Sequence, residues 1–166
     1  MKTEVNPQDT KRAEAFELWM SSPMPMVTLT KTFDVSNLVK ASRKRRVKFN
    51  ALLCWCIGKA ATQAEEFYLL PENGKLFQYD CIAVNVIVNN IKGGINSCDI
   101  PFTDDLKAFL HEYDTLTQFL VAWNNRLPCN DLALRIFTTH THREMAWACA
   151  RILIFLKCAF YNSIFQ

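Results

Sequence analysis

Residues 48–80 constrain the fold more than any other part of the chain, because they predict a helix, a turn and a strand in direct succession. Apolar residues recur there at the three- and four-residue steps of an amphipathic helix, at Leu53, Ile57, Ala60, Ala61, Ala64 and Phe67. Pro71 disfavours the α conformation in the residue before it, so we expect this helix to end near Leu69 and Leu70. The sequence Pro71-Glu72-Asn73-Gly74 predicts a tight turn, and residues 76–79 begin a strand.

The rest of the first 120 residues also mixes helices and strands. Residues 11–20 predict a short helix, residues 27–33 alternate as a half-buried strand does, and a helix follows Asp34 or Ser36. Residues 81–88 are almost continuously apolar, which is typical of a strand covered on both faces. Across a turn at residues 89–94, residues 95–100 return as its hairpin partner, and a helix begins at Thr103 or Asp104 and continues to Trp123. The predicted class is therefore α+β, a mixed α/β two-layer sandwich.

Length and composition indicate one globular domain. The chain has 166 residues and a net charge of +3, too small to imply a nucleic-acid partner by itself. Its seven cysteines show neither a CxxC pair nor a zinc-binding spacing, and we expect them to be free thiols in a reducing compartment. The N-terminus is polar and lacks a signal core, and the apolar run at residues 145–160 is short and interrupted by charge. We expect a cytoplasmic protein without membrane contact.

A basic run at residues 43–48 allows two interpretations. Such a run can contact phosphates, which would make the chain a nucleic-acid binder. Cations also complement the C-terminal dipole of a helix. The second interpretation is favoured, because no aromatic platform or recognition helix accompanies the run. We therefore expect no nucleic-acid partner.

Few residues form a pattern that indicates chemistry. His140 and His142 would share one face of a strand, with Glu144 nearby, but the spacing offers no clear third metal ligand, so we expect no metal. His111 and Glu112 fit a polar helix surface. The sequence contains no Gly-rich phosphate loop and no GxSxG motif. Spacing alone does not indicate an enzyme.

Read in order, several segments resemble the N-terminal and central part of the chloramphenicol acetyltransferase family. They span roughly residues 10–120, keep the family's element order, and comprise residues 11–17, 21–26, 33–35, 48–53, 66–68, 78–80 and 97–102. The resemblance implies an incomplete form of that fold. It also implies an antibiotic-resistance enzyme that moves acetyl from acetyl-CoA, its cosubstrate, to a hydroxyl of chloramphenicol or a similar small molecule.

The family's chemistry rests on a histidine of an HHxxxDG motif. This histidine is the general base that deprotonates the acceptor hydroxyl, which then attacks the thioester directly. Hydrogen-bond donors stabilise the oxyanion. The family forms homotrimers whose sites lie between subunits, and the motif's aspartate pairs with an arginine near the N-terminus.

Part of this pattern carries over to the present chain. By resemblance, Arg12 corresponds to the N-terminal arginine, although a solvated helix residue is an equal alternative. Met24, Pro25 and Met26 fall where the acceptor pocket begins, with core and loop packing as the alternative. The HHxxxDG motif is absent from the 166 residues, so no catalytic residue is assigned. His140 and His142 do not replace it, because Thr141 separates them and no Asp-Gly follows.

Beyond residue 120 both the resemblance and the αβ pattern weaken. We expect residues 1–120 to form the incomplete acetyltransferase-like domain and residues 121–166 to be a divergent tail, read out of frame after a frameshift. Translation of the other two frames should then reveal an HHxxxDG segment. Such a chain would be inactive and would lack the trimer interface. The alternative function is a non-catalytic module that binds a partner through an exposed sheet edge.

Overall fold

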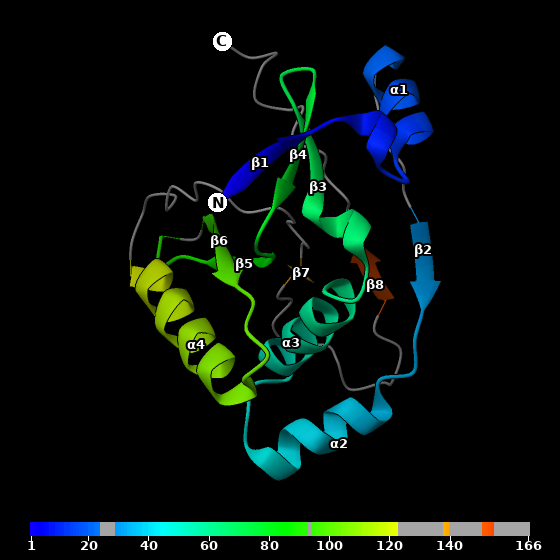
Figure 1. The fold of residues 1–166 in the computed structure, drawn as a ribbon. Coiled ribbons are helices and arrows are strands. Elements are labelled where there is room, and N and C mark those ends of the chain that lie inside the picture. The colour runs from blue at the N-terminus through cyan, green and yellow to red at the C-terminus, as the bar shows by residue number, and fades with distance from the viewer. Residues whose placement is uncertain (24–28, 93, 123–137, 140–150, 155–166) are drawn as a thin grey trace.

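The computed structural model describes residues 1–23, 29–92, 94–122, 138–139 and 151–154 (Figure 1). Within these residues, helices and strands are mixed along the chain, and the strands form three small sheets. This confirms the mixed α and β class. The elements are β1 (Lys2–Val5), η1 (Pro7–Asp9), α1 (Ala13–Ser21), β2 (Leu29–Thr32), α2 (Ser36–Arg45), α3 (Phe49–Ala61), η2 (Glu65–Tyr68), β3 (Leu69–Glu72), β4 (Lys75–Tyr79), β5 (Ala83–Asn89), β6 (Ile95–Pro101), α4 (Leu106–Ala122), β7 (Thr138–Thr139) and β8 (Arg151–Ile154).

The first sheet joins the N-terminus to the middle of the chain, in the order β1-β4-β3. Strand β1 runs antiparallel to β4, with Val5 opposite Leu76, and the sequence did not predict this strand. Strands β3 and β4 form a hairpin whose two-residue turn is Asn73 and Gly74, with φ of 49° and 80°. The predicted turn is thus confirmed, although its first two residues belong to β3. Asn and Gly both tolerate the left-handed conformation that this turn needs.

The predicted helix end near Leu69 and Leu70 is wrong. Helix α3 ends at Ala61, and Leu69 begins strand β3. The last turn of α3 is closed by Thr62. Its hydroxyl donates to the Lys59 carbonyl, and its N–H donates to the Gly58 carbonyl. Leu69 and the residue after it instead pair with β4. Tertiary strand pairing overrides a helical period that continues in the sequence.

The buried face of α3 also differs from the predicted face. Its buried apolar positions include Ala51, Cys54 and Ala61, whereas Leu53 is half-buried and Ala60 is exposed. Gly58 lies on the same buried face, and a Cβ built there would approach the Phe102 ring to 2.3 Å. Small residues let α3 approach its neighbours closely, and Leu52 is the large apolar residue among its buried positions.

The predicted hairpin is confirmed as β5–β6, and both of its strands contribute buried residues to the core. Its strands are antiparallel, with Asn85 opposite Asp99, and β7 pairs with β5 in parallel to give the order β6-β5-β7. One face packs against α3 and α4 in a cluster of buried residues that includes Val84, Val86 and Ile100. The other face carries the alternate residues, among them the fully buried Ala83. A strand covered on both faces is what the continuous apolar sequence predicts.

Short side chains fix the beginnings of two helices. At α2 the N-cap is Val35 rather than the predicted Asp34 or Ser36, and the Asp34 carboxylate, one residue earlier, accepts a hydrogen bond from the Ser36 N–H at 2.9 Å. At α4 the prediction of Thr103 or Asp104 is wrong. The Asp105 carboxylate accepts from the N–H groups of Lys107 and Ala108 at 2.8 and 3.4 Å. Asp105 is one residue closer to the helix and reaches the N–H groups that lack intrahelical partners.

Two strands beyond residue 120 pair with strands before it. Thr138–Thr139 forms β7, which pairs in parallel with β5, and β8 pairs antiparallel with β2, with Leu29 opposite Ile154. None of the helices among the described residues combines the length and apolar character of a membrane span. Cys54, Cys56, Cys81 and Cys98 form no disulfide in the part of the chain that the structure describes.

Candidate functional site

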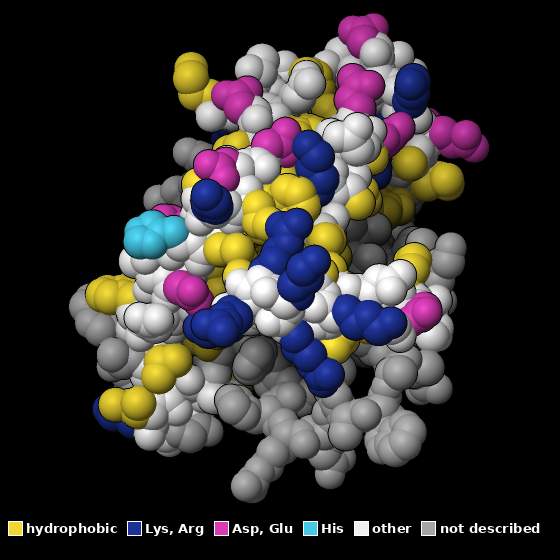
Figure 2. All heavy atoms as spheres, turned by 90° about the horizontal axis from the view of Figure 1, so that it is seen from below, with side chains coloured by type: hydrophobic (Ala, Val, Ile, Leu, Met, Phe, Trp, Pro, Cys, Tyr) yellow, Lys and Arg dark blue, Asp and Glu magenta, His cyan; other side chains and the backbone are white. Residues whose placement is uncertain are grey.

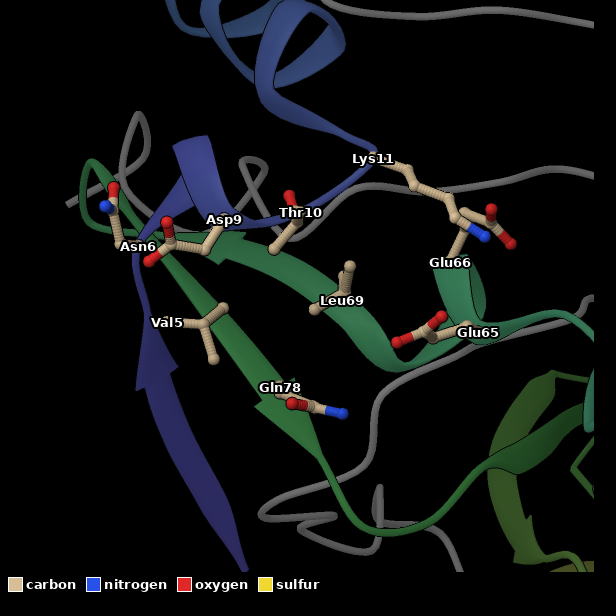
Figure 3. Close-up of a pocket in the computed structure, with 9 residues that line it drawn as sticks. All are labelled: Val5, Asn6, Asp9, Thr10, Lys11, Glu65, Glu66, Leu69 and Gln78. Carbon is tan, nitrogen blue, oxygen red and sulfur yellow. The ribbon is translucent and has the colours of Figure 1, made fainter.

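A cavity of about 440 Å³ lies beside the first sheet, next to the N-terminal arginine position (Figure 3). It opens between the β1–η1 segment, β3, β4 and the short helix η2. Its lining residues are Val5, Asn6, Asp9, Thr10, Lys11, Glu65, Glu66, Leu69 and Gln78. In Figure 3 the Lys11 side chain extends toward Glu66. The cavity therefore lies between the N-terminal segment and the elements that follow α3.

The lining is polar and acidic, with three carboxylates and one ammonium. Two of its polar side chains form hydrogen bonds with nearby backbone groups. Asn6 Oδ1 accepts from the Gln8 N–H, and Thr10 Oγ1 donates to the Pro7 carbonyl at 2.8 Å while it accepts from the Arg12 N–H. Among the described residues, no histidine, cysteine or serine lines the cavity. The cavity can hold a small polar ligand, and these residues include no imidazole that could act as a general base.

A second cavity of about 450 Å³ lies between η1 and α1. Phe16 and Met20 of α1 give it an apolar wall, and Gln8 and Glu17 contribute polar groups. Both cavities touch Asn6. They flank the segment that leads into α1, where the sequence predicted site residues.

A buried polar pair connects the two strands of the central hairpin. Asn85 Nδ2 donates to Asp99 Oδ1 at 2.5 Å, and the two residues are 2% and 7% exposed. A carboxylate only accepts hydrogen bonds, so it fixes the orientation of the amide. Asn85 Oδ1 then has no hydrogen-bond partner among the described residues. The sequence signal for this pair was an asparagine within an apolar strand, and it was missed.

A second buried polar contact joins α3 to α4. Asn50 Nδ2 donates to the Tyr113 hydroxyl oxygen at 2.9 Å. Burial raises the pKa of Tyr113 to about 12, and the hydrogen bond from Asn50 opposes this rise. Burial also raises the pKa of the Cys56 thiol, so that thiol is a poor nucleophile at neutral pH. Within the described ranges, no group of three or more histidine, cysteine or carboxylate residues is placed to hold a metal ion.

Comparison with known proteins decides the lineage. The sequence profile of the family described as "Chloramphenicol acetyltransferase" matches residues 2–149. The chain belongs to the chloramphenicol acetyltransferase family. A solved structure named "chloramphenicol acetyltransferase" shares its fold, with a TM-score of 0.64 and 18% sequence identity over 71% of this chain. The chain spans 56% of the length of that structure. No curated protein sequence matches the chain significantly.

Arg12 is the residue to which the resemblance to the chloramphenicol acetyltransferase family assigns a supporting role. This residue stands immediately before α1, is half-buried, and its carbonyl accepts from the Phe16 N–H at 2.8 Å. Its guanidinium forms no ion pair with a carboxylate in the part of the chain that the structure describes. The supporting role that the family implies for Arg12 therefore stays a prediction.

The other predicted site residues lie outside the part of the chain that the structure describes. Met24, Pro25 and Met26 lie outside the described residues, and so do His140, His142 and Glu144. The family match continues to residue 149, past the expected domain boundary at residue 120. The division of the chain at that residue and the frameshift stay predictions.

Proposed function

We propose that this chain carries the acceptor-side scaffold of a chloramphenicol acetyltransferase, the enzyme that transfers acetyl from acetyl-CoA to an antibiotic hydroxyl. The family match over residues 2–149 carries this proposal. The mixed fold and its likeness to a solved acetyltransferase support it. The acceptor is a chloramphenicol-like alcohol, and acetyl-CoA is the cosubstrate.

The 166 residues on their own transfer acetyl very slowly in this proposal. They contain no HHxxxDG motif and hence no histidine in the role of the family's general base. Loss of a general base typically lowers the rate by about 10²–10⁴-fold. Met24, Pro25 and Met26 begin the acceptor pocket, and Arg12 supports it. The family's trimer would complete that pocket from a neighbouring subunit, and this chain does not form it.

An acetyl-transfer assay tests the proposal. The purified chain is mixed with acetyl-CoA and chloramphenicol, and the release of the CoA thiol is followed with a thiol reagent. A full-length enzyme of the family is the positive control. We expect a rate within error of the protein-free sample. Turnover comparable to the control would contradict the proposed inactivity, and sedimentation as a trimer would contradict the proposed assembly.

The alternative function is a non-catalytic module that binds a partner along a sheet edge. One observation bears on it, because β6 is the outer strand in the order β6-β5-β7 of the described sheet. Unpaired edges favour pairing with another chain. A sharp, cooperative thermal transition without acetyl transfer supports the module, whereas a broad transition contradicts it.

A further inference from the structure

Four consecutive cations close helix α2, and neither the fold nor the proposed acetyl transfer uses them. Arg43, Lys44, Arg45 and Arg46, here called the basic turn, are all exposed. Figure 2 shows Lys and Arg side chains gathered over the face of the molecule seen from below, where α2 lies. The basic turn is thus a concentrated positive surface on a chain whose net charge is only +3.

The basic turn has no counter-charge in the described part of the chain. Ion pairs occupy cations elsewhere, for example Lys48 with Asp114 at 2.8 Å and Lys59 with Asp104 at 2.8 Å. None of the five ion pairs among the described residues includes a member of the basic turn. The four charges repel one another without compensation, and an external anion would relieve that repulsion.

Helix capping does not require the four basic side chains of the basic turn. The carbonyls of Ser42 and Arg43 accept hydrogen bonds from the backbone N–H groups of Arg46 and Val47. Arg46 itself has a φ of 55°, a left-handed conformation in which glycine is normally favoured. The helix end is therefore closed by its own backbone. The helix dipole gives only a small additional preference for cations.

Because the basic turn is exposed and takes part in no ion pair among the described residues, we propose, against the expectation from sequence, that it binds the phosphate backbone of nucleic acid without regard to base sequence. Three of its four residues are arginines, whose planar guanidinium groups match phosphate oxygens in a bidentate manner. Consecutive helical residues point in different directions, so the four side chains surround the helix end and can contact several phosphates of a curved backbone. The interaction is electrostatic, as expected where no aromatic stacking platform is present.

A membrane surface fits these observations less well. A basic helix that binds lipid also inserts an apolar face between the headgroups. The apolar residues Leu38 and Val39 of α2 are half-buried, and α2 packs against α3. A flat bilayer would also meet only the cations on one side of the helix end.

The test compares two variants of the full chain that each lose three charges. R43Q/K44Q/R45Q changes the basic turn and leaves the left-handed Arg46 in place. K11Q/K92Q/K107Q changes three exposed lysines elsewhere that form no ion pair among the described residues. Both variants lower the formal net charge from +3 to 0. The probe is a fluorescent DNA duplex of about 20 base pairs, and anisotropy is measured between about 50 and 200 mM salt.

We expect the slope of log affinity against log salt to be about −3.6 for the wild-type chain, as four phosphate contacts imply. The slope should become shallower, about −0.9, for R43Q/K44Q/R45Q, with at least a roughly tenfold loss of affinity, and stay near the wild-type slope for K11Q/K92Q/K107Q. R43K/R45K, which keeps the charge, should retain the slope. Equal losses in the two triple variants would overturn the proposal, because net charge alone would then explain binding. Tighter binding to phosphatidylserine vesicles or to polyglutamate than to DNA would also overturn it.

Discussion

The Asn50 amide nitrogen donates to the Tyr113 hydroxyl oxygen at 2.9 Å, across a separation of 63 residues in the sequence. This contact joins the first turn of α3 to the middle of α4 inside the core, where Tyr113 is 3% exposed. Both partners are buried, so removal of either leaves the other without its hydrogen bond. The contact therefore links the stability of the domain to the protonation of one phenol.

We expect the free energy of unfolding to decrease between pH 10 and about 12. The folded phenol has a pKa of about 12, above its ordinary value of 10, so the unfolded state loses its proton first as the pH rises. The stabilisation is fully present below pH 10, and its loss amounts to roughly 2–3 kcal/mol. Urea denaturation across this range should show a weaker pH dependence for Y113F than for wild type and for the Y68F control. Parallel curves for all three proteins would contradict this assignment.

N85D should destabilise the chain at pH 7 by about 2–4 kcal/mol. The substitution places a second carboxylate at the Asp99 oxygen that Asn85 now contacts at 2.5 Å, and like charges at this distance cannot both stay ionised at low cost. The loss should shrink as the pH falls toward 5, because one carboxyl then takes up a proton. Melting temperatures at the two pH values measure this effect. N89D, at the exposed end of the same strand, should show neither the loss nor the recovery.

G58A should destabilise the chain by roughly 1–3 kcal/mol, although alanine favours helices over glycine. The new Cβ would lie 2.3 Å from Cδ2 of Phe102, whose ring is tilted against that of Phe109 at a centroid distance of 6.0 Å. Denaturation of G58A, F102V and the double variant gives the coupling energy. The alanine should cost less in the F102V background. Additive effects would mean that the ring moves aside freely.

R46G should stabilise the chain by roughly 0.5–1 kcal/mol, because Arg46 has a φ of 55° that glycine adopts without strain. R45G removes the same charge one residue earlier, inside helix α2, and should destabilise by about 1 kcal/mol. Chemical denaturation of the pair separates backbone conformation from charge. Shifts of the same sign would show that the lost charge dominates.

The predictions from sequence succeeded where the local chemistry was decisive. The sequence at Asn73-Gly74 indicated a tight turn, and the apolar residues 81–88 indicated a strand covered on both faces. They failed where pairing with another strand decides the structure. The helical period after Ala61 yields to the pairing of β3 with β4, and nothing in the polar sequence Lys2–Val5 indicates that it forms strand β1.

The site was predictable only in part for a similar reason. Arg12 could be located from the resemblance, but a local pattern cannot identify the partner of its guanidinium. The Asn85–Asp99 contact depends on strand register, which the sequence at either position does not specify. Asparagine inside an apolar strand is the signal that could have prompted a search for a cross-strand partner.

The pairing of β1 with β4 has a consequence for synthesis of the chain on the ribosome. Lys2 lies opposite Tyr79, so strand β1 gains its partner only after more than seventy further residues have been added. Until then its backbone groups are available to chaperones or to other nascent chains. A pause in translation before Tyr79 has left the exit tunnel would prolong this exposure, whereas a pause shortly afterwards would give the sheet time to close.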